Sequence, residues 1–149
     1  SRQELPLLAE SAQSTLKDIG MDVQINATAD HNTIVKDTSA WDVYVGANVN
    51  CGLGDPTNFF STHCLDASIK NRGQYHSDKM EELAVQLNST FDKTERNQIA
   101  IEMQQQLLDD NAFVFCSFLK MSMISQANVT GLTAHASDYY ELTADLDIN

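Results

Sequence analysis

The feature that most constrains the fold is an apolar stretch that runs into a long connection. Residues 41–46 (Trp-Asp-Val-Tyr-Val-Gly) hold two β-branched and two aromatic side chains, which suit a strand covered on both faces, as in a parallel sheet. About thirty residues separate Gly46 from the next helical pattern, and connections of that length are generally functional or disordered. The aromatic residues within this connection favour order, so we expect it to carry the function.

The remaining patterns predict helices and strands in alternation. Apolar residues spaced by three or four predict a helix over residues 4–19, with Pro6 in its first turn and Gly20 after its end. Met80, Leu83, Ala84 and Leu87 form the core-facing stripe of a second helix, with Asp78 and Glu81 placed to help cap it. Asp92 and Glu95 would cap a third helix that ends near Asn111. The other expected elements are a short helix over 30–36 and strands over 21–25, 40–47 and 113–118, the last continued or paired by 121–125. This order indicates an α/β domain.

Length and charge narrow the function. A chain of 149 residues with 42% hydrophobic content can bury one core, so we expect a single domain over 1–149. Lys and Arg number 9 against 21 Asp and Glu, and the resulting net charge of −12 repels phosphate backbones and anionic membrane surfaces. Nucleic acid is therefore not an expected partner, and no apolar run approaches the roughly 20 residues of a membrane span.

Several motifs together resemble one family. The run Gly54-Asp55-Pro56-Thr57-Asn58-Phe59-Phe60 after the strand, the segments 8–23 and 92–96, and Val129-Thr130-Gly131-Leu132 near the end occur in this order. They resemble the extracytoplasmic solute-binding proteins of ABC importers, specifically the dipeptide, oligopeptide and nickel-chelate branch. The resemblance implies a mixed sheet flanked by helices, as in the C-terminal lobe of a type II periplasmic-binding-protein-like fold. It also implies a separate N-terminal lobe, importer membrane subunits as partners and a place outside the cytoplasm.

In this family two lobes close around a solute, which here would be a small peptide or a metal chelate. The ends of sheet strands are where α/β proteins bind ligands, so we expect contacts from Trp41, Asn48, Asn50, Asp55 and Asn58. Peptide-binding relatives place an acidic group just before the Gly-Asp-Pro motif, whereas residues 47–53 here contain no carboxylate. Neutral amides form hydrogen bonds of roughly half the strength of charged ones, which disfavours a ligand with a free amine unless Asp55 or Asp66 supplies the charge.

Two of these residues have a structural alternative. Glycine, aspartate and proline at positions 54–56 are what a tight turn requires, which favours Asp55 as a turn-former over a direct ligand contact. Trp41 lies in an apolar stretch, which favours a place in the core over one in the cleft.

Three cysteines suggest further hypotheses. Cys51 and Cys64 share the long loop, and the export implied by the resemblance makes a disulfide between them a possibility. Cys51, Cys64 and His63 are also soft ligands that suit a metal-binding module, although no paired spacing supports one. A cysteine-dependent hydrolase built on the same residues is the alternative of a different class. We expect no catalytic residue, no resident metal and no cofactor.

The family usually begins this lobe with a strand just before the position of Ser1. A vacant sheet position would leave an unpaired edge, so we also expect that the lobe could form a homodimer near its N-terminus.

Overall fold

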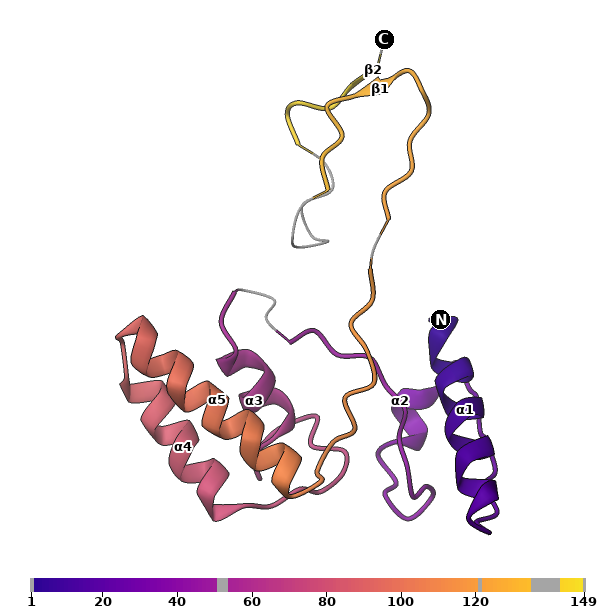
Figure 1. Ribbon diagram of the computed structural model, residues 1–149, viewed down its shortest axis with the longest axis vertical. Coiled ribbons are helices and arrows are strands. Elements are labelled where there is room, and N and C mark those ends of the chain that lie inside the picture. Colours follow the sequence, from indigo (N-terminus) through magenta and orange to yellow (C-terminus); the bar gives the residue numbers. More distant parts are fainter. Residues whose placement is uncertain (1, 51–53, 121, 135–142, 149) are drawn as a thin grey trace. The chain divides into compact units, whose positions relative to one another are not determined.

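The computed structural model describes residues 2–50, 54–120, 122–134 and 143–148. The chain divides into two compact units, Ser1–Phe113 and Val114–Asn149 (Figure 1). The single domain expected over 1–149 stays a prediction.

The first unit begins with helix α1 (Glu4–Asp18), which confirms the helix predicted over 4–19. Gly20 follows it with φ of +87°, a left-handed conformation that glycine adopts without a steric penalty and that commonly ends helices. The side-chain amide of Gln13 donates a hydrogen bond to the carbonyl of Val23 at 2.6 Å, which ties the following chain to the helix. A short helix α2 (His31–Ile34) lies within the predicted range 30–36.

The core of the first unit lies among three helices that pack together in Figure 1: α3 (Thr57–His63), α4 (Asp78–Ser89) and α5 (Lys93–Asp109). The predicted stripe of α4 is confirmed, because all four of its apolar residues are buried. Helix α5 adds its own buried face, and α3 contributes two phenylalanines. The buried cluster comprises Phe59, Phe60, Cys64, Met80, Leu83, Ala84, Leu87, Ala100, Met103 and Leu107.

Side-chain caps fix where α4 and α5 begin. The carboxylate of Asp92 accepts hydrogen bonds from the backbone N–H groups of Thr94 and Glu95, at 2.9 and 3.0 Å, as predicted. The α4 cap is Ser77, whose hydroxyl accepts from the N–H of Met80 at 3.4 Å. Asp78 and Glu81, expected to help cap α4, lie instead in its first turn, where negative charge favours the positive end of the helix.

The prediction of three strands is wrong. In the part of the chain that the structure describes, residues 21–25, 40–47 and 113–118 belong to no strand. A β-branched or aromatic side chain favours an extended backbone, but a strand also needs a neighbour to share its hydrogen bonds. Exposed apolar side chains such as Met21 and Val43 show that these segments also lack the cover expected for buried strands. A mixed sheet flanked by helices stays a prediction.

A second correction concerns the long loop. Helix α3 lies within the stretch expected to be irregular. Its sequence Thr-Asn-Phe-Phe-Ser-Thr-His contains no strong helix former, so local propensity gave no signal. Burial of Phe59 and Phe60 against α4 and α5 outweighs that weak propensity.

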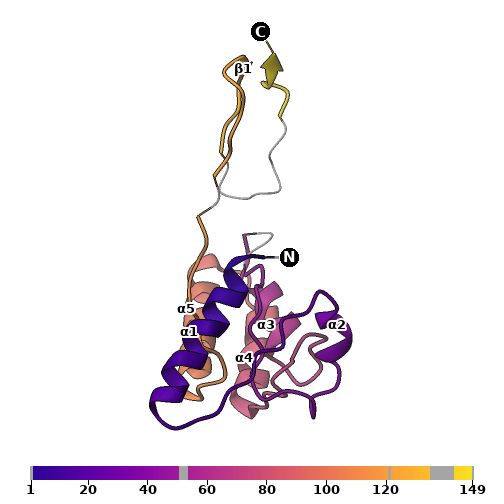
Figure 2. The same ribbon diagram turned by 90° about the vertical axis from the view of Figure 1, so that its right-hand side faces the viewer.

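The second unit contains a small antiparallel ladder of β1 (Val129–Thr130) and β2 (Asp147–Ile148) (Figure 2). Val129 lies opposite Ile148, and Thr130 lies opposite Asp147. Gly131 follows β1 with φ of +75°, and a Cβ atom at this position would overlap the carbonyl oxygen of Asp145. Only glycine allows this close approach of the two backbones.

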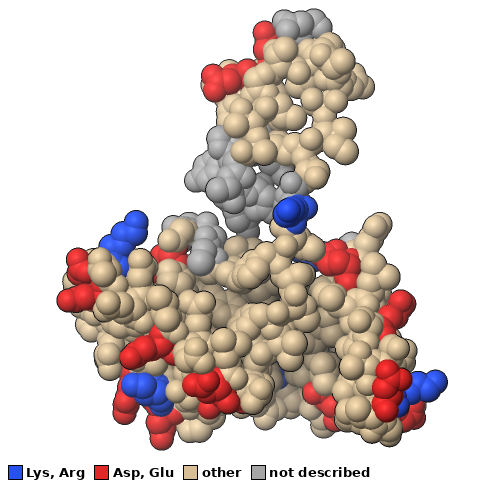
Figure 3. Space-filling model, in the orientation of Figure 1, with Lys and Arg blue, Asp and Glu red and all other residues tan. Residues whose placement is uncertain are grey.

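The surface reflects the composition. On the face shown in Figure 3, acidic side chains are spread over the helices, while basic ones are few and isolated. Among the residues that the structure describes, no helix combines the length and apolar character needed to cross a membrane.

Candidate ligand-binding segment

The predicted ligand contacts lie in two neighbouring ranges of the chain, residues 41–50 and 54–58. We call these two ranges together the loop segment. Asn48 is exposed and Asn50 half-buried, both just before residues 51–53, which lie outside the described residues. Asp55 precedes α3, and Asn58 is exposed on its first turn, where its side-chain oxygen accepts a 3.4 Å hydrogen bond from Thr62. The loop segment thus offers amide groups on both sides of the Gly-Asp-Pro motif.

Asp55 forms the turn that leads into α3. One carboxylate oxygen accepts a hydrogen bond from the N–H of Thr57 at 2.8 Å, and the other accepts from Arg96 Nη2, also at 2.8 Å. The pKa of Asp55 is lowered, chiefly by hydrogen bonds from the hydroxyl and N–H of Thr57, with Arg96 adding to the effect. The ionised carboxylate is thus engaged with its own chain, and a ligand amine would have to compete with Arg96.

Arg96 joins the motif to the two long helices. Its Nη1 donates to the carbonyls of Leu87 and Thr90 at 2.6 and 2.8 Å, and its Nη2 also donates to the hydroxyl of Thr57 at 2.8 Å. The guanidinium therefore holds the end of α4, the start of α5 and the start of α3 in one place. Only 22% of its side chain is exposed, so these bonds are partly shielded from water.

Trp41 is half-buried, and its ring lies against that of Tyr44 with centroids 6.0 Å apart. The indole nitrogen of Trp41 is buried and has no hydrogen-bond partner within the described residues. Trp41 is not part of the buried cluster between α3, α4 and α5.

Cys64 and His63 point into the core. Cys64 is a free cysteine and almost fully buried, whereas Cys51, its partner in the bridge considered above, lies outside the described residues. The ring of His63 packs on Phe59 with centroids 5.3 Å apart, and burial lowers the pKa of His63. Within the described ranges, no group of three or more His, Cys, Asp and Glu residues is arranged to hold a metal ion.

The burial of Cys64 makes a prediction about its reactivity. Burial raises the pKa of the thiol to about 12, so almost no thiolate, the reactive form, exists at neutral pH. Iodoacetamide should therefore modify the exposed Cys116 of the native protein and leave Cys64 intact, as measured by mass spectrometry of its peptides. In urea both should react. Rapid modification of Cys64 in the native protein would contradict its burial. It would favour the alternative hypothesis of a cysteine-dependent hydrolase.

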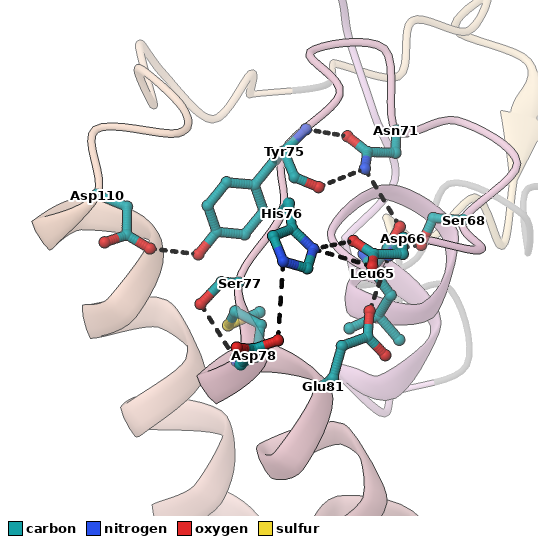
Figure 4. A network of polar contacts seen from close by, with 11 residues as sticks. Leu65, Asp66, Ser68, Asn71, Tyr75, His76, Ser77, Asp78, Glu81 and Asp110 are labelled. Carbon is teal, nitrogen blue, oxygen red and sulfur yellow. Dashed lines mark hydrogen bonds and ion pairs between the residues drawn. The ribbon is translucent and has the colours of Figure 1, made fainter.

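A network of polar contacts orders the chain between α3 and α4 (Figure 4). Asn71 accepts from the N–H of Tyr75 at 2.9 Å and donates to the carbonyls of Tyr75 and Leu65 at 2.7 and 3.2 Å. The Tyr75 hydroxyl donates to Asp110 at 2.5 Å, which joins this connection to the end of α5. The side chains of Asn71 and Tyr75 therefore hold the connection between α3 and α4 in place.

Asp66, the other candidate for a charged ligand contact, belongs to this network. His76 Nδ1 lies 2.8 and 2.9 Å from its two carboxylate oxygens. This contact is the main reason why the pKa of His76 is raised. The N–H of Asp66 also donates to Glu81 at 2.8 Å. Asp66, like Asp55, already has a side-chain partner in its own chain.

Sequence reasoning missed Arg96, the residue that organises the loop segment. One signal was present: Arg96 lies in the first turn of α5, where the helix dipole disfavours a cation. An arginine in that position implies compensating acceptors nearby, and the structure supplies them as Asp55, Leu87 and Thr90.

Comparison with known proteins gives one informative similarity. Over 99 residues, or 66% of its length, the chain is 31% identical to a protein of Staphylococcus aureus (strain NCTC 8325 / PS 47) named nickel-binding protein NikA. The matched stretch spans 20% of that relative. No family model matches the chain, and no solved structure matches it. The similarity agrees with the nickel-chelate branch of the family that the sequence motifs resemble.

Proposed function

We propose that this chain supplies one wall of the solute site in an extracytoplasmic solute-binding protein of an ABC importer. The observation that carries the proposal is the 31% identity to a nickel-binding protein. The order of motifs from residue 8 to residue 132 supports the same family. Because the chain spans only a fifth of that relative, the second wall and the contacts to importer membrane subunits belong to parts of a longer protein.

In this proposal the chain belongs to a C-terminal lobe with a mixed sheet flanked by helices, as in a type II periplasmic-binding-protein-like fold. The protein binds its solute without catalysis. Closure of two lobes about a hinge buries the solute and creates the form that the importer recognises.

The polar groups of the loop segment favour a metal chelate over a dipeptide as the solute. A dipeptide amine needs an available carboxylate, yet Asp55 is paired with Arg96 and Asp66 with His76. Asn48, Asn50 and Asn58 offer neutral donors and acceptors, which suit the carboxylate and carbonyl oxygens on the outside of a chelate. Trp41 adds a half-buried aromatic ring to the same segment.

Equilibrium titration of the chain tests this function. Nickel held by excess citrate should bind weakly, with a dissociation constant of roughly 0.1–10 mM, because the opposite wall and the closure are absent. Alanyl-alanine should bind more weakly still. Replacing Asn48 and Asn50 together by alanine should reduce the nickel–citrate affinity at least threefold.

Asn88 and Asn97 provide the matched control, since both are exposed, lie on α4 and α5 and are not residues of the loop segment. Alanine at those two positions should leave the affinity unchanged. Tight one-to-one binding of alanyl-alanine, or equal losses in both double variants, would contradict the proposed function.

A further inference from the structure

Four titratable residues lie close together where the connection between α3 and α4 meets the start of α4 (Figure 4). His76 Nδ1 lies 2.8 and 2.9 Å from the two carboxylate oxygens of Asp66, and His76 Nε2 lies 3.7 Å from a carboxylate oxygen of Asp78. Glu81, in the first turn of α4, accepts a hydrogen bond from the N–H of Asp66 at 2.8 Å. We call these four residues, all of which belong to the first unit, the His76 cluster.

The imidazole ring of His76 faces a carboxylate with each of its two nitrogens. Only the protonated ring carries an N–H on both nitrogens. The neutral ring keeps one proton, so it turns a lone pair towards either Asp66 or Asp78. Loss of the ring proton therefore replaces two attractive contacts by one hydrogen bond and one repulsive contact.

His76 is also the cation on which the cluster depends. Among the ion pairs of the described residues, none joins Asp66, Asp78 or Glu81 to a lysine or arginine. The three carboxylates come from two parts of the chain, because Asp66 lies in the connection and the other two lie in the first turn of α4. With a neutral His76, like charges would face each other across this contact without a cation between them, which disfavours the contact.

We propose that the charge of His76 controls how firmly residues 64–77 are held against the start of α4. With the ring protonated, two contacts hold this connection: the ion pairs of His76 and the hydrogen bond from the N–H of Asp66 to Glu81. With the ring neutral, repulsion between Asp66 and the two acidic residues of α4 opens the first contact and weakens the second. The device acts within the first unit and does not depend on the solute.

The pKa of His76 is raised in the folded protein, first by the hydrogen bond and the charge of Asp66 and then by the charges of Asp78 and Glu81. A histidine whose pKa is raised on folding stabilises the structure fully below its unfolded pKa, near 6.5. That contribution is lost as the pH rises through the folded pKa. The connection is therefore held in mildly acidic solution and loosens in alkaline solution.

Exchange of amide hydrogens with water, measured by NMR on the ¹⁵N-labelled chain, tests the proposal. The reporter is the N–H of Asp66, which is bound to Glu81. Its protection factor corrects for the intrinsic pH dependence of exchange. This factor should fall about threefold or more between about pH 6 and 9, with the same midpoint as the titration of the His76 ring. His76→Gln cannot titrate and should remove this step.

The N–H of Glu95 is the matched control, because it too is bound to a carboxylate near the start of a helix, that of Asp92. Its protection factor should show no step at the midpoint of the His76 titration. Asp66→Asn should lower the pKa of His76, because it removes the largest cause of the raised value. Far-UV circular dichroism checks that both variants keep their helices.

Three results would overturn the proposal. The first is a protection factor for the N–H of Asp66 that stays constant while His76 titrates. The second is the same step at Glu95, which would mean that the loosening is not local. The third is an unchanged step in His76→Gln, which would mean that another group causes it.

Discussion

Replacing Leu107 by alanine should lower the free energy of unfolding of the helical unit by about 2–5 kcal/mol, the usual cost of truncating a fully buried leucine. Leu107 has no exposed surface and lies in the cluster that joins α5 to α3 and α4. The small core of this unit has few residues with which to fill the cavity. Urea unfolding followed by circular dichroism at 222 nm measures the change.

The adjacent Leu108 is the control, since it has the same chemistry but points about 100° further round the helix and is 51% exposed. Alanine is a strong helix former, so Leu108→Ala should cost less than about 1 kcal/mol. Similar losses for the two leucines would mean that α5 does not present the assigned face to the core.

Replacing Arg96 by alanine should have the second largest effect, a loss of about 2–3 kcal/mol in the free energy of unfolding. The substitution leaves the carbonyls of Leu87 and Thr90 and the carboxylate of Asp55 without their donor. We reduce the expected cost because Asp55 is 43% exposed and water partly replaces the lost partner. Arg96→Lys should recover little of the lost stability. One ammonium group cannot reach these three acceptors and the hydroxyl of Thr57 together.

The pH dependence separates the ion pair from the other hydrogen bonds. The pKa of Asp55 is lowered in the folded protein, so its contribution is complete above the unfolded value near 3.9 and is lost as pH falls through the folded value. The stability difference between the native chain and Arg96→Ala should thus narrow below about pH 4 without vanishing.

Arg2→Ala is the control for the loss of an arginine, because Arg2 is 53% exposed and its contact with Glu4 is 3.9 Å long. It should change the stability by less than about 0.5 kcal/mol. An Arg96 variant as stable as the Arg2 variant would remove the structural role assigned to the Asp55–Arg96 pair.

The helices were predictable because their signals are local. The stripe from Met80 to Leu87 shows the α4 core face in sequence, and Asp92 marks the start of α5. Propensity, capping and periodicity act within one or two turns, so the sequence alone contains them. Helix α3 escaped prediction because its stability comes from Phe59 and Phe60 packing on helices that follow later in the chain.

The strands were not predictable to the same degree. Residues 40–47 have strand composition, but a strand requires a partner that composition does not identify. The role of Arg96 was hidden for a related reason. Its acceptors lie 6 to 41 residues away along the chain, and only the packing of α3 against α4 and α5 brings them together.

The central claim, that the loop segment is one wall of a solute site, is tested most directly by residue-resolved NMR of the ¹⁵N-labelled chain during titration with nickel held by excess citrate. Paramagnetic nickel broadens the signals of nearby amides, and citrate limits binding of the free ion to surface histidines such as His31 and His76. The account predicts that amides of residues 41–50 and 54–58 broaden first and saturate together. Broadening centred on His76, or an unaffected loop segment at saturating nickel–citrate, would contradict it.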